Sequence, residues 1–156
     1  MATIGDVLAN DDPTSFAIAL SDLVFPRYDR DGFESLSAAE RVAYCVDALE
    51  REVNNGGFEQ FFGNSSGDTA AETHAALQAI GAAQGASLLQ SATSLFTNGA
   101  PPRDRDERLD AIDAMSDETR SKWRELDERF CAYPDDLTSL MRRFVNAHRS
   151  EFRDWP

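Results

Sequence analysis

Apolar side chains recur every three to four residues through most of the chain, which is the period of an α-helix. Val46, Leu49 and Val53 form one such stripe. The stripe follows Ser37 and Glu40, whose spacing is that of a capping box at a helix N-terminus. No alternating strand pattern of convincing length occurs. The sequence therefore predicts an all-α fold of about seven or eight helices.

Caps and prolines predict where several helices begin and end. Asp12, followed by proline, marks a helix start, and Pro26 is expected to stop that helix. The charged residues 27–35 are then expected to form a loop. Asp68 and Thr69 are predicted to cap a later helix, because Thr69 precedes a glutamate by three residues.

The length of 156 residues predicts one domain over residues 1–156 with a substantial core. The N-terminus lacks a charged segment followed by an apolar one, and no run approaches the ~18 apolar residues of a membrane span. We therefore expect a cytoplasmic protein that does not contact a membrane. Cys45 and Cys131 have no spacing typical of a zinc site and are predicted to be buried thiols.

The chain carries a formal net charge of −13. Residues 1–75 hold 14 acids and four bases, whereas residues 76–156 hold 14 acids and 11 bases. An excess of negative charge creates an electrostatic field that repels nucleic acid and attracts basic partners. We therefore do not expect direct binding to nucleic acid. Solubility or adaptation to a salty cytoplasm is the alternative explanation, and Lys122 as the single lysine fits a salt-adapted or arginine-rich proteome.

Two groups of acidic residues are candidates for contacting a partner. Asp106, Asp110 and Asp113 recur on one helix face, spaced by roughly 4.5–6 Å along the axis, close to the separation of neighbouring phosphates. Asp117 would continue this ladder unless Ser116 caps a new helix. A solvated helix face is the alternative for the ladder. The second group lies in the acidic half of the chain: Asp29, Asp31, Glu34, Glu40, Glu50 and Glu52.

Catalytic signatures are missing from the sequence. There is no GxSxG, Walker, GxGxxG or HExxH motif. His74 lies two residues after a glutamate, which places the two side chains on different helix faces, and His148 shares the apolar face of the last helix. We therefore expect no catalytic residue, no metal and no cofactor.

The segment EVNNGGFEQFFGNSSGD, residues 52–68, combines turn formers with a cluster of phenylalanines. Glycine and asparagine tolerate the positive φ that ends a helix, and the phenylalanines have the spacing of a short helix directed into a core. We predict a corner between two helices in which the polar side chains bond backbone groups freed by the turns. The alternative is a polar pocket. The residues of this motif are Asn54, Asn55, Gly56, Gly57, Phe58, Gln60, Phe61, Phe62 and Asn64.

This segment, the ALQAIGA that follows it, and LDERFCAYPDDLTSLMRRFVNAHRSEF near the C-terminus resemble the DNA mimic protein 19-like family, a bacterial domain-of-unknown-function family. The resemblance spans about residues 35–153. It implies an all-helical acidic protein that forms a homodimer, mimics duplex DNA with its surface charges and occupies the DNA-binding face of a transcription factor.

Charge and resemblance together predict a protein-binding module that competes with DNA for a basic DNA-binding protein. An antitoxin or immunity protein that blocks a basic nuclease would use the same electrostatics. An enzyme or ligand-binding protein that uses the polar cluster of residues 54–64 is the third alternative.

Overall fold

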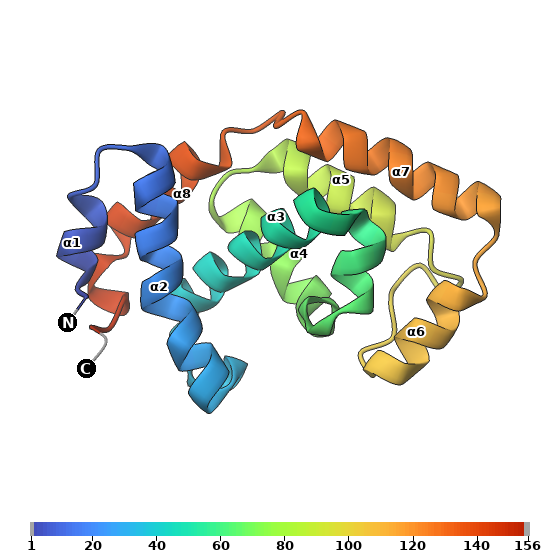
Figure 1. Cartoon of the computed structure of the whole chain (residues 1–156), viewed down its shortest axis with the longest axis horizontal. Coiled ribbons are helices and arrows are strands. Elements are labelled where there is room, and N and C mark those ends of the chain that lie inside the picture. Colours follow the sequence, from blue (N-terminus) through green and yellow to red (C-terminus); the bar gives the residue numbers. More distant parts are fainter. Residues whose placement is uncertain (1, 155–156) are drawn as a thin grey trace.

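The computed structural model describes residues 2–154 and consists of helices joined by short connections (Figure 1). Within that range there are eight α-helices, three short 3₁₀ turns and no strand, which confirms the all-α prediction. The molecule is elongated, with both chain ends at one extremity and helix α6 at the other (Figure 1).

The α-helices are α1 (Ile4–Leu8), α2 (Pro13–Asp31), α3 (Ala38–Gly63), α4 (Ala70–Ala79), α5 (Ala83–Thr93), α6 (Arg105–Asp113), α7 (Asp117–Cys131) and α8 (Leu137–Ala147). The 3₁₀ turns are η1 (Phe33–Ser35), η2 (Ser65–Thr69) and η3 (Arg149–Glu151).

Helix α3 passes through the middle of the molecule and supplies much of the core. Phe58, Phe61 and Phe62 are completely buried. The Phe62 ring packs on Trp123 of α7 at a centroid distance of 5.5 Å and edge-on against Phe96 at 5.0 Å. The prediction that these phenylalanines point into the core is therefore confirmed.

The double glycine bends α3 instead of ending it. Gly56 and Gly57 have non-helical backbone angles, and helical geometry resumes after them. The amide of Phe58, at the start of the second half, donates to the carboxylate of Asp127 on α7 over 2.7 Å. A side chain from another helix thus caps this new helix start, and the motif forms the predicted corner.

Helix α2 does not stop at Pro26, so that prediction is wrong. The helix continues to Asp31 and ends at Gly32, whose φ is 82°. Two contacts beyond the proline hold the extra turn in place. Arg27 forms an ion pair with buried Glu40, and the Tyr28 ring stacks on Tyr44 at 4.1 Å. These tertiary contacts compensate for the backbone hydrogen bond that proline removes.

Two of the predicted caps are present and two are not. Asp12 accepts from the amide of Ser15, and Ser37 forms its capping box with Glu40. Thr69 instead donates its hydroxyl to the Ser66 carbonyl, and Asp68 accepts from the guanidinium of a buried arginine, Arg108. Both side chains are therefore engaged in tertiary or turn contacts, and α4 begins without a side-chain cap.

Candidate acidic binding surface

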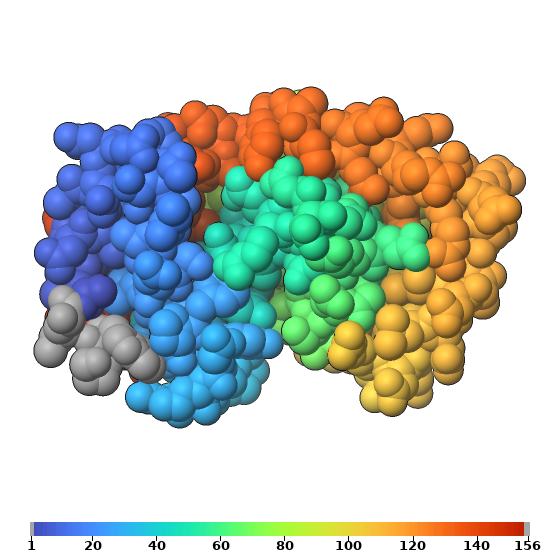
Figure 2. Space-filling model, in the orientation of Figure 1, coloured from blue at the N-terminus to red at the C-terminus, as the bar shows by residue number. Residues whose placement is uncertain are grey.

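Three aspartates of α6 form an exposed row of negative charge. Asp106, Asp110 and Asp113 are exposed, and none of their carboxylates accepts a hydrogen bond or ion pair within residues 2–154. The helix projects at the extremity of the molecule that lies away from the chain ends (Figure 2, yellow-orange). The row ends at Asp113, because Ser116 caps α7 by accepting from the Thr119 amide and Asp117 begins that new helix.

A completely buried arginine fixes α6 to the rest of the molecule. The guanidinium of Arg108 donates to the carbonyl oxygens of residues 62, 64, 102 and 103 and to the carboxylate of Asp68. It therefore joins α6 to the end of α3, to η2 and to the connection of residues 94–104. Arg120 of α7 donates to the Ile112 carbonyl at the other end of α6, over 2.8 Å. The aspartate row is thus held on a rigid support.

Glu40 does not belong to an exposed surface, which corrects its place among the candidate contact residues. Its side chain is completely buried. The carboxylate accepts from Arg27, from the side chain and amide of Arg153, and from the Ser37 amide. The reason is that a glutamate in a capping box can face the core, and here two arginines from other segments compensate its charge.

Glu50 and Glu52 are partly buried and are engaged by neutral donors. Glu50 accepts from the Tyr133 hydroxyl over 2.9 Å. Glu52 accepts from the side-chain amides of Gln60 and Asn64 over 2.6 and 3.0 Å. Burial raises the pKa of Glu50, against the opposing effect of its hydrogen bond from Tyr133. These two carboxylates stabilise the fold through hydrogen bonds, and they contribute little to an exposed acidic surface.

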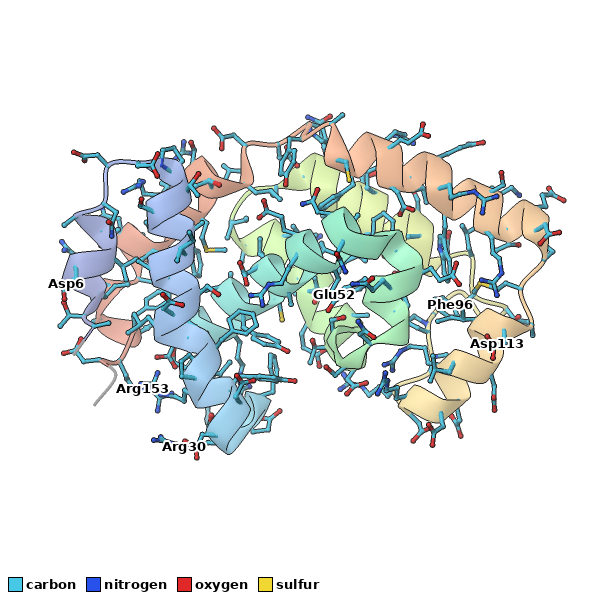
Figure 3. The ribbon with its side chains drawn as sticks, viewed as in Figure 1. Asp6, Arg30, Glu52, Phe96, Asp113 and Arg153 are labelled. Carbon is cyan, nitrogen blue, oxygen red and sulfur yellow. The ribbon has the colours of Figure 1, made fainter. Side chains whose placement is uncertain are left out.

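The remaining candidates lie at the end of α2 and in η1. Asp29, Asp31 and Glu34 are exposed, but Asp31 is paired with Arg30, and Glu34 is paired with Arg41 over 2.9 Å. Arg30, Glu52 and Asp113 are labelled in Figure 3, and each marks one of the candidate regions. The three residues are well separated along the molecule. The structure therefore brings the nine predicted residues into several places and not onto one face.

The polar side chains of the α3 corner bind mainly to one another. Asn55 donates to Gln60 over 3.1 Å, Gln60 and Asn64 both donate to Glu52, and Asn54 donates to the Glu50 carbonyl over 2.8 Å. The expectation that all of them bond backbone groups is thus correct only for Asn54. Glu52, which sequence reasoning assigned to the surface, is the acceptor that organises this cluster.

The distribution of charge along the sequence holds a signal that the half-chain totals obscure. Residues 73–102 contain no Asp, Glu, Lys or Arg, although 28% of the chain is charged. This stretch forms most of α4, all of α5 and the start of the following connection. The longest uncharged segment of the sequence therefore corresponds to a surface of α4 and α5 without charged side chains, which we call the neutral surface.

Among residues 2–154, no three His, Cys, Asp or Glu side chains are grouped so that they could hold a metal ion. None of the helices in that range combines the length and hydropathy that crossing a bilayer requires.

Comparison with known proteins supports the resemblance in the sequence. The family model described as DMP19-like protein matches residues 34–148. Neither the curated proteins nor the solved structures gave a match. The matched region covers most of the chain and includes the α3 corner, α6 and its buried arginine. The protein therefore belongs to the family of DMP19-like proteins.

Proposed function

We propose that this protein is a non-catalytic binding module that occupies the DNA-binding face of a basic protein by presenting carboxylates where DNA presents phosphates. The observation that carries the proposal is the row Asp106, Asp110 and Asp113, which is exposed, has no basic partner within residues 2–154, and lies on a helix anchored by Arg108. Preorganised charges cost little to order when a partner binds, which favours recognition at this helix.

Negative charge is concentrated at the α6 end of the molecule. Residues 104–118 carry seven exposed carboxylates: Asp104, Asp106, Glu107, Asp110, Asp113, Asp117 and Glu118. The two arginines of this stretch are engaged with backbone carbonyls, Arg108 in the core and Arg105 at Gly63. A DNA-binding protein typically contacts about 6–10 phosphates. Seven carboxylates and two arginines give residues 104–118 a net charge of −5, so the α6 end alone supplies much of the charge of a DNA site.

Two kinds of basic partner fit this surface, and the partner's identity separates them. A transcription factor would make the protein a regulator of DNA binding, whereas a basic nuclease would make it an antitoxin or immunity protein. Affinity capture from lysate of the source cell, followed by mass spectrometry, identifies the partner. The purified partner is then titrated with this protein and with duplex DNA at several salt concentrations.

We expect this protein and DNA to exclude one another, and the complex to weaken as salt rises, because exposed charges are screened over about 8–10 Å at physiological ionic strength. Simultaneous binding of DNA and this protein to the partner would contradict mimicry. Binding that is insensitive to salt would contradict it as well, and the acidity would then be explained by solubility.

Two triple variants of equal charge test whether α6 is the contact surface. The first replaces Asp106, Asp110 and Asp113 by Asn. The second, a matched control, replaces Asp29 and Asp31 by Asn and Glu34 by Gln. Both raise the net charge of −13 by three, so they change the overall field equally. We expect the α6 variant to weaken the complex at least tenfold more than the control. Equal weakening would contradict a contact at α6.

The homodimer that the resemblance implies is proposed to form through the neutral surface of α4 and α5. Two copies with 13 net negative charges each repel one another, and the repulsion is smallest where a surface has no charged side chains. Interface cores are likewise depleted of charged residues. This arrangement leaves α6 of each copy accessible to a partner.

A further inference from the structure

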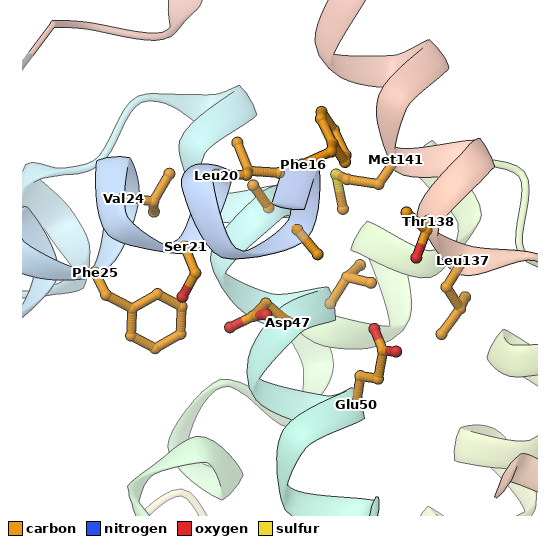
Figure 4. Close-up of a pocket in the computed structure, with 13 residues that line it drawn as sticks. Phe16, Leu20, Ser21, Val24, Phe25, Asp47, Glu50, Leu137, Thr138 and Met141 are labelled. Carbon is orange, nitrogen blue, oxygen red and sulfur yellow. The ribbon is translucent and has the colours of Figure 1, made fainter. Parts of the chain in front are cut away.

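A narrow apolar opening lies between α2 and α8, with α3 as its floor (Figure 4). Its volume is about 30 Å³, room for only one or two water molecules. Small-molecule sites usually have volumes of hundreds of Å³. The opening is therefore suited to the end of one side chain. Its main apolar lining residues are Phe16, Leu20, Val24, Val46, Leu137 and Met141.

Two carboxylates of α3 line this apolar opening, and they differ in their partners. Asp47, on the α2 side, forms an ion pair with Arg51. Glu50, on the α8 side, accepts at Oε1 from the neutral hydroxyl of Tyr133, while no hydrogen bond reaches its Oε2 within residues 2–154. Burial raises the pKa of both carboxyl groups, against the hydrogen bonds that lower it. The charge of Glu50 thus lacks a cation in an environment that disfavours an isolated charge.

We propose that this opening receives the end of one lysine side chain of a protein partner, with the ammonium group at Oε2 of Glu50, the last methylenes against Leu20 and Met141, and the rest of the stem outside the opening. A lysine combines a long apolar stem with a compact cationic end, which matches an apolar opening with a carboxylate at its floor. The guanidinium of arginine has four heavy atoms in a plane and therefore needs more room than the single nitrogen of an ammonium group, which favours lysine in an opening of about 30 Å³.

Two exposed hydrophobic side chains that neighbour lining residues indicate that the lysine comes from a protein. Ile18 of α2, one turn before the lining residue Ser21, is 57% exposed and is one of the two large hydrophobic side chains that are exposed within residues 2–154. The other, Tyr133, is the residue that contacts Glu50. A partner's backbone and neighbouring side chains would cover both. This contact is independent of the α6 aspartates and would add to the specificity of whatever partner they attract.

The test uses n-butylammonium as an analogue of the lysine side chain and follows the methyl NMR signals of Leu20, Leu137 and Met141. We expect these signals to shift saturably at millimolar concentrations, and n-butanol, which lacks the charge, to bind at least tenfold more weakly. Glu50→Gln should weaken n-butylammonium binding by a similar factor, whereas Glu125→Gln, the same change at an exposed position of α7, should leave it unchanged. The proposal would be overturned if the methyl signals of Leu20, Leu137 and Met141 did not respond to n-butylammonium. It would also be overturned if Glu50→Gln bound n-butylammonium as tightly as the wild type does.

A second variant and a second probe complete the test. Ala17→Leu fills the opening from the α2 wall while Glu50 keeps its charge, so it should abolish the shifts even if Glu50→Gln proves unstable. The capped amino acid N-acetyl-lysine N-methylamide should bind at least as well as n-butylammonium, and capped arginine should bind more weakly. Binding of n-butylammonium without binding of the capped lysine would show that the site takes a free amine, which contradicts a protein partner.

Discussion

Gly57 meets two separate demands at the α3 corner. Its φ of 75° lies in the left-handed region, which glycine adopts without steric cost. A Cβ atom at this position would also lie 2.2 Å from Oδ2 of Asp127, the carboxylate that caps the amide of Phe58. The same residue therefore allows the backbone to turn and allows α7 to approach closely enough to cap the second half of α3.

Replacing Gly57 by alanine is expected to lower the free energy of unfolding by about 2–4 kcal/mol, the sum of backbone strain and of the displaced cap. Urea denaturation at neutral pH measures this change. Gly99→Ala is the matched control, since Gly99 has a φ of 73° and no atom within 4 Å of its added Cβ. The control should lose only the part of the free energy of unfolding that backbone strain accounts for. A Gly57→Ala variant as stable as Gly99→Ala would show that the Asp127 contact is unimportant.

At the scale of the elements, Glu40 joins three parts of the chain. It belongs to α3, its carboxylate is paired with Arg27 of α2, and it accepts from the amide of Arg153 beyond η3 over 3.0 Å. Burial opposes ionisation of Glu40, yet the hydrogen bonds from Arg153 and Ser37 outweigh it and lower the pKa. Glu40 is therefore charged in the folded protein at neutral pH, and the network ties α2 and the C-terminal segment to the central helix.

We expect Glu40→Gln to lower the free energy of unfolding at pH 7 by about 3–5 kcal/mol, because it removes the negative charge that faces two arginines. Since folding lowers the pKa of Glu40, its contribution is present above the ordinary value of 4.5 and is lost as the pH falls below it. Urea denaturation of both proteins between pH 7 and pH 3 should therefore show the difference shrinking below about pH 4.5.

Glu34→Gln is the control for this experiment, because Glu34 is exposed and its pair with Arg41 should contribute at most about 1 kcal/mol. A constant difference between wild type and Glu40→Gln over the whole pH range would mean that the ionised carboxylate is not what stabilises the network.

Local signals predicted the elements well where neighbouring residues determine the structure. The caps at Asp12 and Ser37 bond amides only three residues away, so the sequence pattern is sufficient to find them. Pro26 and Thr69 misled because distant residues decide the outcome there, through the Tyr44 stack on the extended α2 and through the turn that Arg108 organises. No local pattern contains that information.

The candidate binding surface could likewise be predicted only where neighbouring residues determine it. The spacing of Asp106, Asp110 and Asp113 was sufficient to predict a row on one helix face. The sequence could not distinguish exposed Asp110 from buried Glu40, because both are acidic residues in amphipathic helices. Their difference depends on Arg27 and Arg153, which approach Glu40 from segments far away in the sequence.

At the scale of the whole molecule, charge is distributed by surface and not by halves of the chain. The acidic first half contributes Glu40, Asp47, Glu50 and Glu52 to buried or hydrogen-bonded positions. The second half, nearly balanced in total, contributes the exposed acids of α6 and the neutral surface of α4 and α5. The two proposed surfaces should consequently respond to salt in opposite directions.

Self-association through α4 and α5 should strengthen as salt rises, because salt screens the repulsion between two copies of net charge −13, whereas the complex with a basic partner should weaken. Light scattering coupled to size exclusion measures the first effect as a mass that rises toward two chains. Ser87→Asp places a charge on the neutral surface and should restore the monomer at moderate salt. Ser121→Asp, an identical change at an exposed position of α7, should not. If both variants dimerise like the wild type, the contact lies elsewhere, and a wild-type protein that stays monomeric at high salt and high concentration excludes the homodimer.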